Sequence, residues 1–482
     1  MATTVRRAVR RAWLAVGALV VLAAASGPAH GQELRAELGR RLARFERAWE
    51  EADPATRARA VAPMEEAVRS FFALQLGNAA QRLDEAWYAV RAGAPPSDDE
   101  RRAVAAAVSV VPKLADASAA GLTVALAPLY DRADPPAGAR LHLAITTAGG
   151  EAVAAVERAW TGGEIAWDPG PLPEGDLTLA VECRVGDVRI PCVTRGLSRA
   201  TRLADRLAAL AEAGSTWPAA ADPTVRATVA QTTTLLTALA DGSQPETDYP
   251  AARLLAFAEG LVAGGGTADG RIATAARDHD VWLTLAQAGG GQVPVRLRAP
   301  PAAVGALPVL FLLHGAGGSE NMFFETCGAG RAVRLGTERG WLVVAPRQGM
   351  FGLGLDVDGM LAALAVHFPI DRTRVFLVGH SMGAVQTSRQ VAKHPRLVAA
   401  AVGLGGGGTV SKDEAARRVP WFIAAGARDF GKRGAEALAT QLTAAGSTVT
   451  YREIPDVEHM VIVQAALDEV FSFLDGIPRR GD

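Results

Sequence analysis

The sequence lacks an excess of charge of either sign. Its 482 residues include 50 Lys and Arg against 51 Asp and Glu, which gives a formal net charge of −1. Proteins that bind nucleic acids neutralise phosphates with clustered basic side chains. This chain has no long basic run after its extreme N-terminus, so we expect no nucleic-acid partner.

Cysteine is also scarce, with three residues in the whole chain, too few for a disulfide framework. Cys183 and Cys192 flank Gly186-Asp187, which is typical of a hairpin turn. A two-residue turn there pairs Cys183 with Ile190 and leaves Cys192 diagonal to it, at about 7–8 Å, too far for easy bridging. A Cys183–Cys192 disulfide stays open, because a bulge or another register would bring the two closer. Cys327 is expected to be a buried thiol.

The apolar stretch 12–25 is shorter than the about 20 residues that cross a bilayer. It follows four arginines within positions 6–11 and precedes small residues that end near Gly31, which is the order of an export signal. We expect residues 1–31 to be a signal peptide and the remaining chain to be secreted or periplasmic. No stable membrane span is expected after cleavage, and an uncleaved N-terminal anchor is the alternative.

The apolar periodicity changes twice between residues 32 and 266. Residues 32–120 have helical spacing, and from about residue 121 the period becomes two, as in half-buried strands. Residues 121–196 are therefore expected to form a small β-sandwich-like module, which resembles immunoglobulin- or fibronectin-like accessory domains. Residues 197–266 are predicted to be a helical region and linker. We expect these regions to be scaffold, with substrate or surface binding as the alternative.

Residues 267–482 alternate between short apolar runs and helical stretches, the pattern of repeated β-α-β units. A pair of strands is expected to open this domain, and five runs bounded by turn residues follow, as in buried parallel strands. The predicted strands lie at 281–285, 293–297, 309–313, 341–345, 374–378, 399–403 and 421–425. The predicted fold class is α/β, with a mostly parallel sheet and helices on both faces.

The pentapeptide Gly379-His380-Ser381-Met382-Gly383 lies between the apolar run 374–378 and a predicted helix at 384–394. A G-x-S-x-G between a strand and a helix is the context of a nucleophile elbow, a tight turn that exposes the serine hydroxyl. Gly379 and Gly383 are expected to supply clearance, because a Cβ at either place would collide with the neighbouring element. We therefore predict Ser381 as a nucleophile.

A serine nucleophile needs a base and an orienting acid, which follow an elbow serine in the order acid, then His. After Ser381 the chain has two histidines, His394 and His459. His394 ends the helix that begins at the nucleophile and is expected to point away from it. His459 follows the predicted strand 449–454 in a loop, so we predict His459 as the general base.

The acid is expected at the end of a strand between the nucleophile and the base. Asp429 lies just beyond the predicted strand 421–425, with Gly426 allowing the turn. Asp456 is the competitor, but it lies three residues before His459 on the same loop. We predict Asp429, which would fix the imidazole tautomer and stabilise the imidazolium.

The loop His314-Gly315-Ala316-Gly317-Gly318 closes the predicted strand 309–313. Backbone amides in such a loop and after the nucleophile are the usual oxyanion donors, so we predict those of Ala316 and Met382, with Gly317 as the alternative to Ala316. His314 is expected to position the loop. The segment lacks the Lys-Ser/Thr ending of a phosphate-binding loop, and no residue pattern indicates a cofactor or metal.

The residues expected near this loop are apolar, except for one arginine. Arg347 is expected either to contact an anionic group or to have a structural role. The expected pocket lining is Met322, Phe323, Phe324, Met350 and Phe351.

Residues from about 280 to 476 resemble the α/β-hydrolase superfamily. The features that carry this resemblance are Leu312-Leu313 with the loop 314–318, Pro369-Ile370-Asp371, the pentapeptide 379–383, Asp429 and His459. The region is most similar to compact secreted esterases of the polyhydroxybutyrate-depolymerase and feruloyl-esterase kind, and to prolyl-oligopeptidase-like hydrolases. It departs from many relatives at Ala384, where they have a further glycine.

The resemblance implies an exported serine hydrolase that cleaves small-molecule or polymeric carboxylic esters through an acyl-enzyme. One alternative is a prolyl-oligopeptidase-like serine peptidase. Another is a polymer- or partner-binding protein with a weakly active hydrolase platform. The motifs are specific for the superfamily and leave the acyl group, the alcohol and the oligomeric state open.

Overall fold

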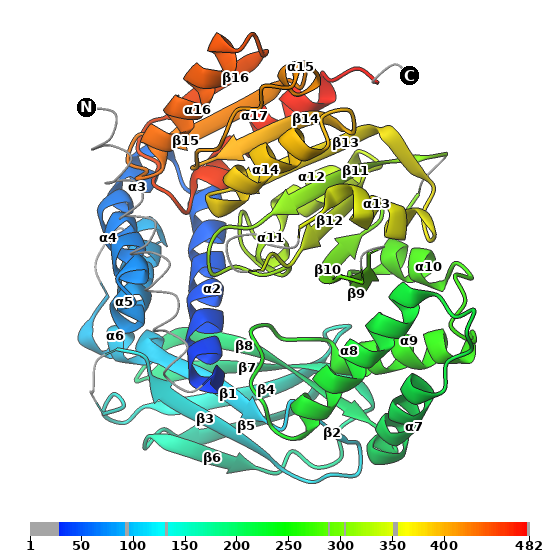
Figure 1. The fold of residues 1–482 in the computed structure, drawn as a ribbon. Coiled ribbons are helices and arrows are strands. Elements are labelled where there is room, and N and C mark those ends of the chain that lie inside the picture. The colour runs from blue at the N-terminus through cyan, green and yellow to red at the C-terminus, as the bar shows by residue number, and fades with distance from the viewer. Residues whose placement is uncertain are drawn as a thin grey trace. The chain divides into compact units, whose positions relative to one another are not determined.

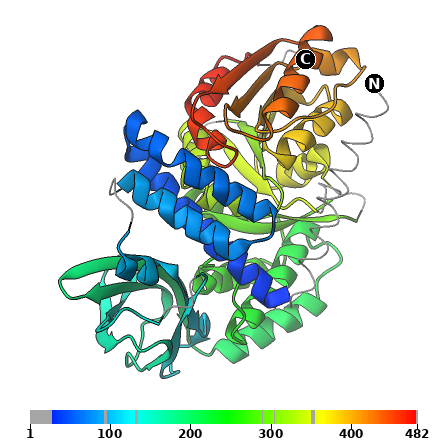
Figure 2. The same ribbon diagram turned by 90° about the vertical axis from the view of Figure 1, so that its left-hand side faces the viewer.

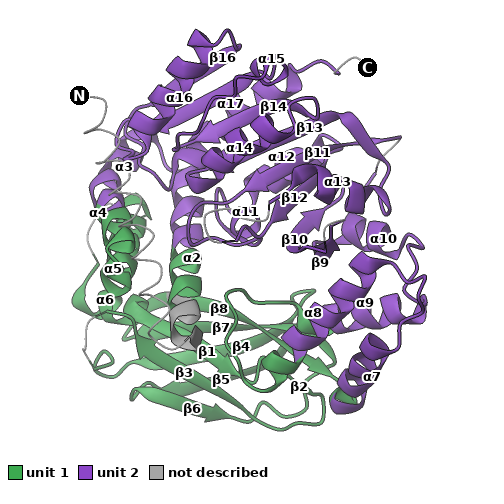
Figure 3. Ribbon diagram, viewed as in Figure 1, with its two compact units in different colours: residues 1–41, 66–203, 237–252 green, residues 42–65, 204–236, 253–482 purple. Residues whose placement is uncertain are grey.

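The computed structural model describes residues 28–91, 96–130, 134–287, 290–302, 305–349 and 355–479. The chain forms two compact units (Figure 3): residues 1–41, 66–203 and 237–252 make up unit 1, and residues 42–65, 204–236 and 253–482 make up unit 2. Both units are discontinuous in sequence, so neither coincides with one of the consecutive regions expected above. Among the helices that cross the unit boundaries are α2 (Pro28–Glu51), α4 (Val61–Phe72), α8 (Pro223–Ala240) and α9 (Ala251–Ala263).

Unit 1 contains two β-sheets (Figure 1). The first has the strand order β1-β3-β6 and the second β2-β8-β7-β4-β5. Apart from the parallel pair β2–β8, the strand pairs are antiparallel. The elements are α5 (Leu76–Arg91), α6 (Asp98–Ala105), β1 (Ala106–Val111), β2 (Leu114–Asp116), β3 (Leu122–Pro128), β4 (Arg140–Thr147), β5 (Ala152–Ala159), β6 (Gly163–Trp167), β7 (Gly175–Val185) and β8 (Val188–Ala200).

The expected boundaries of this β region are wrong at both ends. β1 begins at Ala106 and β2 precedes residue 121, while β8 continues to Ala200, beyond the expected helix start at 197. In β1 the buried residues Ala106, Val108 and Val110 recur at period two. The first two residues of β1 are alanines that follow helix α6 directly, and alanine suits a helix well, so the sequence pattern does not mark where the strand begins.

The hairpin of β7 and β8 has the expected pairing of Cys183 with Ile190. The register shifts between the pairs Val181–Val193 and Glu182–Pro191, so Cys192 is the extra residue of a bulge in β8. The side chain of Cys192 lies outside the described residues, so the disulfide stays open.

Unit 2 contains an eight-stranded sheet with the order β16-β15-β14-β13-β11-β12-β10-β9. The strands from β12 to β16 in this order run parallel, whereas β10 is antiparallel to both β12 and β9. This arrangement confirms the α/β fold class with a mostly parallel sheet, preceded by helices and small sheets. The strands are β9 (Val281–Ala286), β10 (Gln292–Arg298), β11 (Leu307–Leu313), β12 (Leu342–Pro346), β13 (Ile370–His380), β14 (Val398–Leu404), β15 (Trp421–Gly426) and β16 (Val449–Ile454).

Helices cover both faces of this sheet, and Figure 2 shows α17 and α14 on opposite sides of it. Each residue of the central strands β11 and β14 is buried, as expected for a parallel sheet covered on both faces. The remaining helices are α3 (Pro54–Arg59), α7 (Leu203–Ser215), α10 (Arg271–Asp278), α11 (Met322–Glu325), α12 (Arg331–Glu338), α13 (Val357–Ala365), α14 (Met382–Lys393), α15 (Glu414–Arg417), α16 (Lys432–Ala444) and α17 (Ile462–Asp475).

The part of α2 that belongs to unit 2 contributes a buried carboxylate, Glu46. Its two oxygens accept hydrogen bonds from the amides of Cys327 and Gly328, each at 3.0 Å. Cys327, Gly328, Ala329 and Gly330 all have positive φ, between 49° and 81°, and turns of this kind direct successive amides at one anion. Burial raises the pKa of Glu46 to about 8, although the amide donors oppose the shift.

Glu46→Gln is expected to lower the free energy of unfolding of unit 2 by about 1–3 kcal/mol, the cost of an unpaired buried donor. The amide nitrogen of glutamine cannot accept from the loop amides. Urea unfolding measures the change. Glu51→Gln, at an exposed position of the same helix, should change stability by less than about 0.5 kcal/mol. Equal effects of the two substitutions would contradict the assigned contact.

Candidate active site

Ser381 occupies the turn between β13 and α14. Its φ of 56° and ψ of −114° lie in a sparsely populated region for a residue with a side chain, at a cost of about 1–3 kcal/mol. The Ser381 amide donates to the carbonyl of Leu404, at the end of β14, at 2.8 Å. The surrounding strands thus hold the serine in a strained turn at the carboxyl end of β13, and such strain is typical of functional sites.

Gly379 and Gly383 allow this turn to form, as expected. A Cβ on Gly379 would overlap the carbonyl group of Gly383, and a Cβ on Gly383 would overlap that of Leu313. Both obstacles are backbone atoms, so neither clash could be relieved by a change of rotamer.

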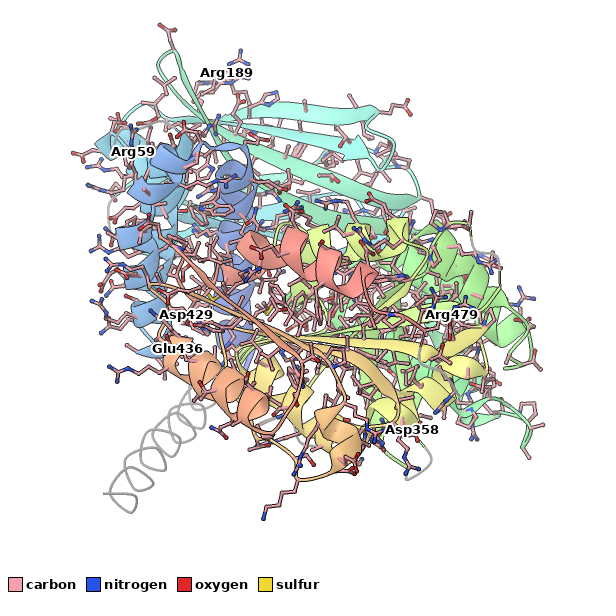
Figure 4. All side chains as sticks on the ribbon, turned by 90° about the horizontal axis from the view of Figure 1, so that it is seen from above. Arg59, Arg189, Asp358, Asp429, Glu436 and Arg479 are labelled. Atoms are coloured by element: carbon pink, nitrogen blue, oxygen red, sulfur yellow. The ribbon has the colours of Figure 1, made fainter. Side chains whose placement is uncertain are left out.

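The structure brings Ser381, His459 and Asp429 together. Asp429 follows β15, next to α16 (Figure 4), and His459 lies in the loop between β16 and α17. Nδ1 of His459 lies 2.7 Å from Oδ1 of Asp429, and Nε2 lies 2.9 Å from Oγ of Ser381. The carboxylate can only accept, so Nδ1 carries the proton and Nε2 accepts from the serine hydroxyl.

The Asp429 carboxylate is buried and fixed. Its Oδ1 also accepts a hydrogen bond from the Gly431 amide at 2.6 Å. Burial acts to raise the pKa of Asp429, but the hydrogen bonds from His459 and Gly431 outweigh it and leave the pKa below its ordinary value. The group is therefore ionised at neutral pH, beside an imidazole that is 1% exposed.

The alternative acid and base residues are engaged elsewhere or exposed. His394 Nε2 lies 2.7 Å from Asp356 Oδ1, and Asp456 is an exposed turn residue with φ of 52°. His314 Nε2 accepts from the Gln348 amide at 3.0 Å, and Nδ1 donates to the carbonyl of Gly315 at 2.8 Å. His314 therefore anchors its loop, as expected.

The predicted oxyanion donors lie in segments that adjoin Ser381. Met382 follows it directly as the first residue of α14. In the upstream loop, a Cβ on Gly315 would lie 3.2 Å from Cβ of Ser381. The Gly318 amide donates to the Gly315 carbonyl at 3.2 Å, which makes Ala316 and Gly317 the central residues of a turn. The assignment of the amides of Ala316 and Met382 stays a prediction.

Two of the residues expected to line an apolar pocket, Phe323 and Phe324, have contacts of another kind. Phe323 is fully buried, and the Arg296 guanidinium lies 4.6 Å from the ring centre of Phe324. Met350 and Phe351 lie outside the described residues. Arg347 forms a bidentate ion pair with Glu320 at 2.5 and 2.8 Å, the structural role that was one of its two expected functions.

Two buried residues beside the base were missed in the sequence. His380 Nε2 donates to the carbonyl of His459 at 2.8 Å. The Glu458 carboxylate accepts from the amides of Met460 and Val461 at 2.7 and 2.9 Å. Both residues fix the backbone that carries the imidazole. Their adjacency to Ser381 and His459 was a signal. The partner of His380 is 79 residues away in sequence, and the burial of Glu458 depends on the fold, so neither role is visible in the sequence.

No protein-family model and no curated protein matches this chain. Among solved structures, it is similar to an S-formylglutathione hydrolase from Agrobacterium tumefaciens, with 17% identity and a TM-score of 0.34 over 42% of this chain and 95% of that one. A ferulic acid esterase matches with 17% identity and a TM-score of 0.35 over 41% and 96%. A mutant feruloyl esterase module from Clostridium thermocellum, complexed with sinapinate, matches with 15% identity and a TM-score of 0.35 over 42% and 90%. Each likeness covers under half of this chain, and the function proposed below therefore rests on the site itself.

Two further features concern the described residues alone. They include no helix that is both long and apolar enough to cross a bilayer. They also include no group of three or more His, Cys, Asp or Glu side chains arranged to hold a metal ion.

Gly383→Ala is expected to destabilise unit 2 by about 3 kcal/mol or more, because the added methyl overlaps backbone atoms of β11. Gly260→Ala is the matched control, since an added Cβ in α9 meets nothing within 4 Å. That substitution should be neutral or stabilising by up to about 1 kcal/mol. Thermal or urea unfolding of both variants measures the contrast, and a stable Gly383→Ala protein would contradict the close approach.

His380→Gln is expected to reduce the acid sensitivity of folding. Burial, with the charge of His459, lowers the pKa of His380 to about 3, whereas an unfolded chain binds this proton near pH 6.5. His380 therefore contributes stability above pH 6.5 that is lost as the pH falls from about 6.5 towards 3. Wild type should lose about 1–2 kcal/mol more than His380→Gln between pH 6.5 and 5, measured by urea unfolding. Parallel pH curves would contradict a buried neutral imidazole.

Proposed function

We propose that this chain is an exported serine hydrolase that cleaves carboxylic esters through an acyl-enzyme on Ser381. The observation that supports this most is the hydrogen-bond chain from Ser381 Oγ through His459 to Asp429. A serine hydroxyl is a weak nucleophile until a neighbouring base takes its proton. Here the base, its orienting carboxylate and a strained turn at the nucleophile occur together.

In the first half of the reaction, Ser381 Oγ attacks the ester carbonyl carbon while His459 Nε2 takes the hydroxyl proton. Asp429, ionised and bound to Nδ1–H, stabilises the imidazolium. The amides of Ala316 and Met382 would stabilise the oxyanion, and losing one such donor typically costs about 2.7–4 kcal/mol. The imidazolium then gives its proton to the alcohol oxygen as the bond between carbon and that oxygen breaks.

In the second half, water attacks the acyl carbon. His459 Nε2 takes a proton from the water and returns it to Ser381 Oγ as the carboxylic acid leaves. The same three side chains therefore serve both steps. The alcohol has left before the second step begins.

Two parts of the proposal rest on the sequence. The choice of an ester over an amide follows the resemblance of residues 280–476 to secreted esterases. Export follows the basic and apolar pattern of residues 1–31, of which positions 1–27 lie outside the described residues.

Ser381→Ala is expected to lower kcat for p-nitrophenyl butyrate by about 10⁴-fold or more, because the attacking oxygen is removed. Asp429→Asn should lower kcat strongly as well, since an amide favours the wrong imidazole tautomer. Ser472→Ala, at an exposed position of α17, is the control and should leave the rate unchanged. Unchanged hydrolysis by Ser381→Ala would exclude the acyl-enzyme.

A panel of dipeptide p-nitroanilides beside the ester panel tests the bond that is cleaved. We expect kcat/KM to be higher for the esters by about 10²-fold or more. Faster cleavage of the amides would instead indicate a peptidase, and no turnover of either panel would favour a binding protein on this fold.

A further inference from the structure

Phe430 is a large apolar side chain that is 61% exposed. A single exposed phenylalanine is ordinary in a folded protein, but the position of this one is not. Its ring centre lies 3.9 Å from that of His459, with 35° between the ring planes. Phe430 therefore covers one side of the imidazole and still presents most of its surface outward.

The backbone on both sides of Phe430 is fixed. The Asp429 amide donates to the carbonyl of Gly426 at 3.1 Å, and the Gly431 amide donates to Asp429 Oδ1 at 2.6 Å. A Cβ on Gly431 would overlap the carbonyl of Gly405, so this turn is packed against the end of β14. The contact between Phe430 and His459 is thus set by the same turn that positions the acid.

The place of His459 in the reaction determines which part of a substrate meets this ring. Ser381 Oγ retains the acyl group, whereas His459 Nε2 delivers a proton to the departing alcohol oxygen. That oxygen must come within hydrogen-bond reach of Nε2. The group attached to it therefore lies next to the imidazole, on which Phe430 rests.

We propose that Phe430 is a specificity-determining residue that binds the alcohol portion of the ester and favours flat, apolar alcohols such as benzyl alcohol. This inference rests on the esterase activity proposed above and assigns the substrate class on the leaving-group side. Offset or edge-to-face contact between two aromatic rings strengthens binding by a factor of about 2 to 10. The same ring has no part in deacylation, because the alcohol has already left.

The test compares benzyl butyrate with ethyl butyrate, which form the same butyryl-enzyme. Phe430→Ala should lower the ratio of kcat/KM for benzyl over ethyl ester by about 3- to 10-fold. Phe430→Tyr keeps a ring and should retain the wild-type ratio within about twofold. Decay of the butyryl-enzyme, followed by quenched-flow mass spectrometry, should have the same rate in wild type and Phe430→Ala.

Val366→Ala is the control, because Val366 is 54% exposed and lies outside the site, so the ratio should not change. An unchanged ratio in Phe430→Ala would overturn the assignment while leaving the esterase proposal intact. Equal losses on both esters, with slower decay of the butyryl-enzyme, would also overturn it and make Phe430 a support for His459. Absence of ester hydrolysis by wild type would overturn both proposals.

Discussion

The site depends on the close approach of backbone segments at the carboxyl ends of neighbouring parallel strands. The turn at Ser381 exists because Gly383 lets the start of α14 touch the carbonyl of Leu313 at the end of β11. At the end of β15, Gly426 lies so close to the carbonyl of Val457, in the loop after β16, that a Cβ on Gly426 would overlap it. These contacts bring the ends of β11, β13, β15 and β16 to one place. The three side chains meet because their strands end there, and the sheet order fixes which strands are neighbours.

Electrostatics then separate the buried carboxylates near the base into two kinds. Asp429 is bound by the imidazole as well as by an amide, and its pKa is lowered. Glu458, one residue before His459, accepts from two backbone amides, and burial raises its pKa to about 8, with the charge of Asp429 acting in the same direction. One carboxylate is therefore kept ionised for the imidazole to use. Glu458 holds the loop and, because its pKa is raised, keeps its proton to higher pH. The site therefore does not have to accommodate two neighbouring negative charges.

The strands of the unit 2 sheet could be predicted from the sequence. So could the choice of Ser381, Asp429 and His459, which the structure brings within hydrogen-bond distance of one another. Buried parallel strands are short apolar runs with turn residues at both ends, and the order of serine, acid and histidine leaves few alternatives. The start of β1 could not be predicted, because its first two residues are alanines, which also suit a helix. The roles of His380, Phe430 and Glu46 could not be predicted either. Each depends on a partner that is distant in sequence: His459 for His380 and Phe430, and the loop at Cys327 for Glu46.

Covalent labelling tests the central claim most directly, because it locates the nucleophile without depending on the natural substrate. The full chain, treated with a fluorophosphonate and digested with trypsin, would be analysed by tandem mass spectrometry. The account predicts one phosphonyl adduct within the peptide 375–389, on Ser381 rather than Ser388, and its loss in His459→Ala. An adduct on another residue, or ester hydrolysis that continues while Ser381 is fully labelled, would contradict it.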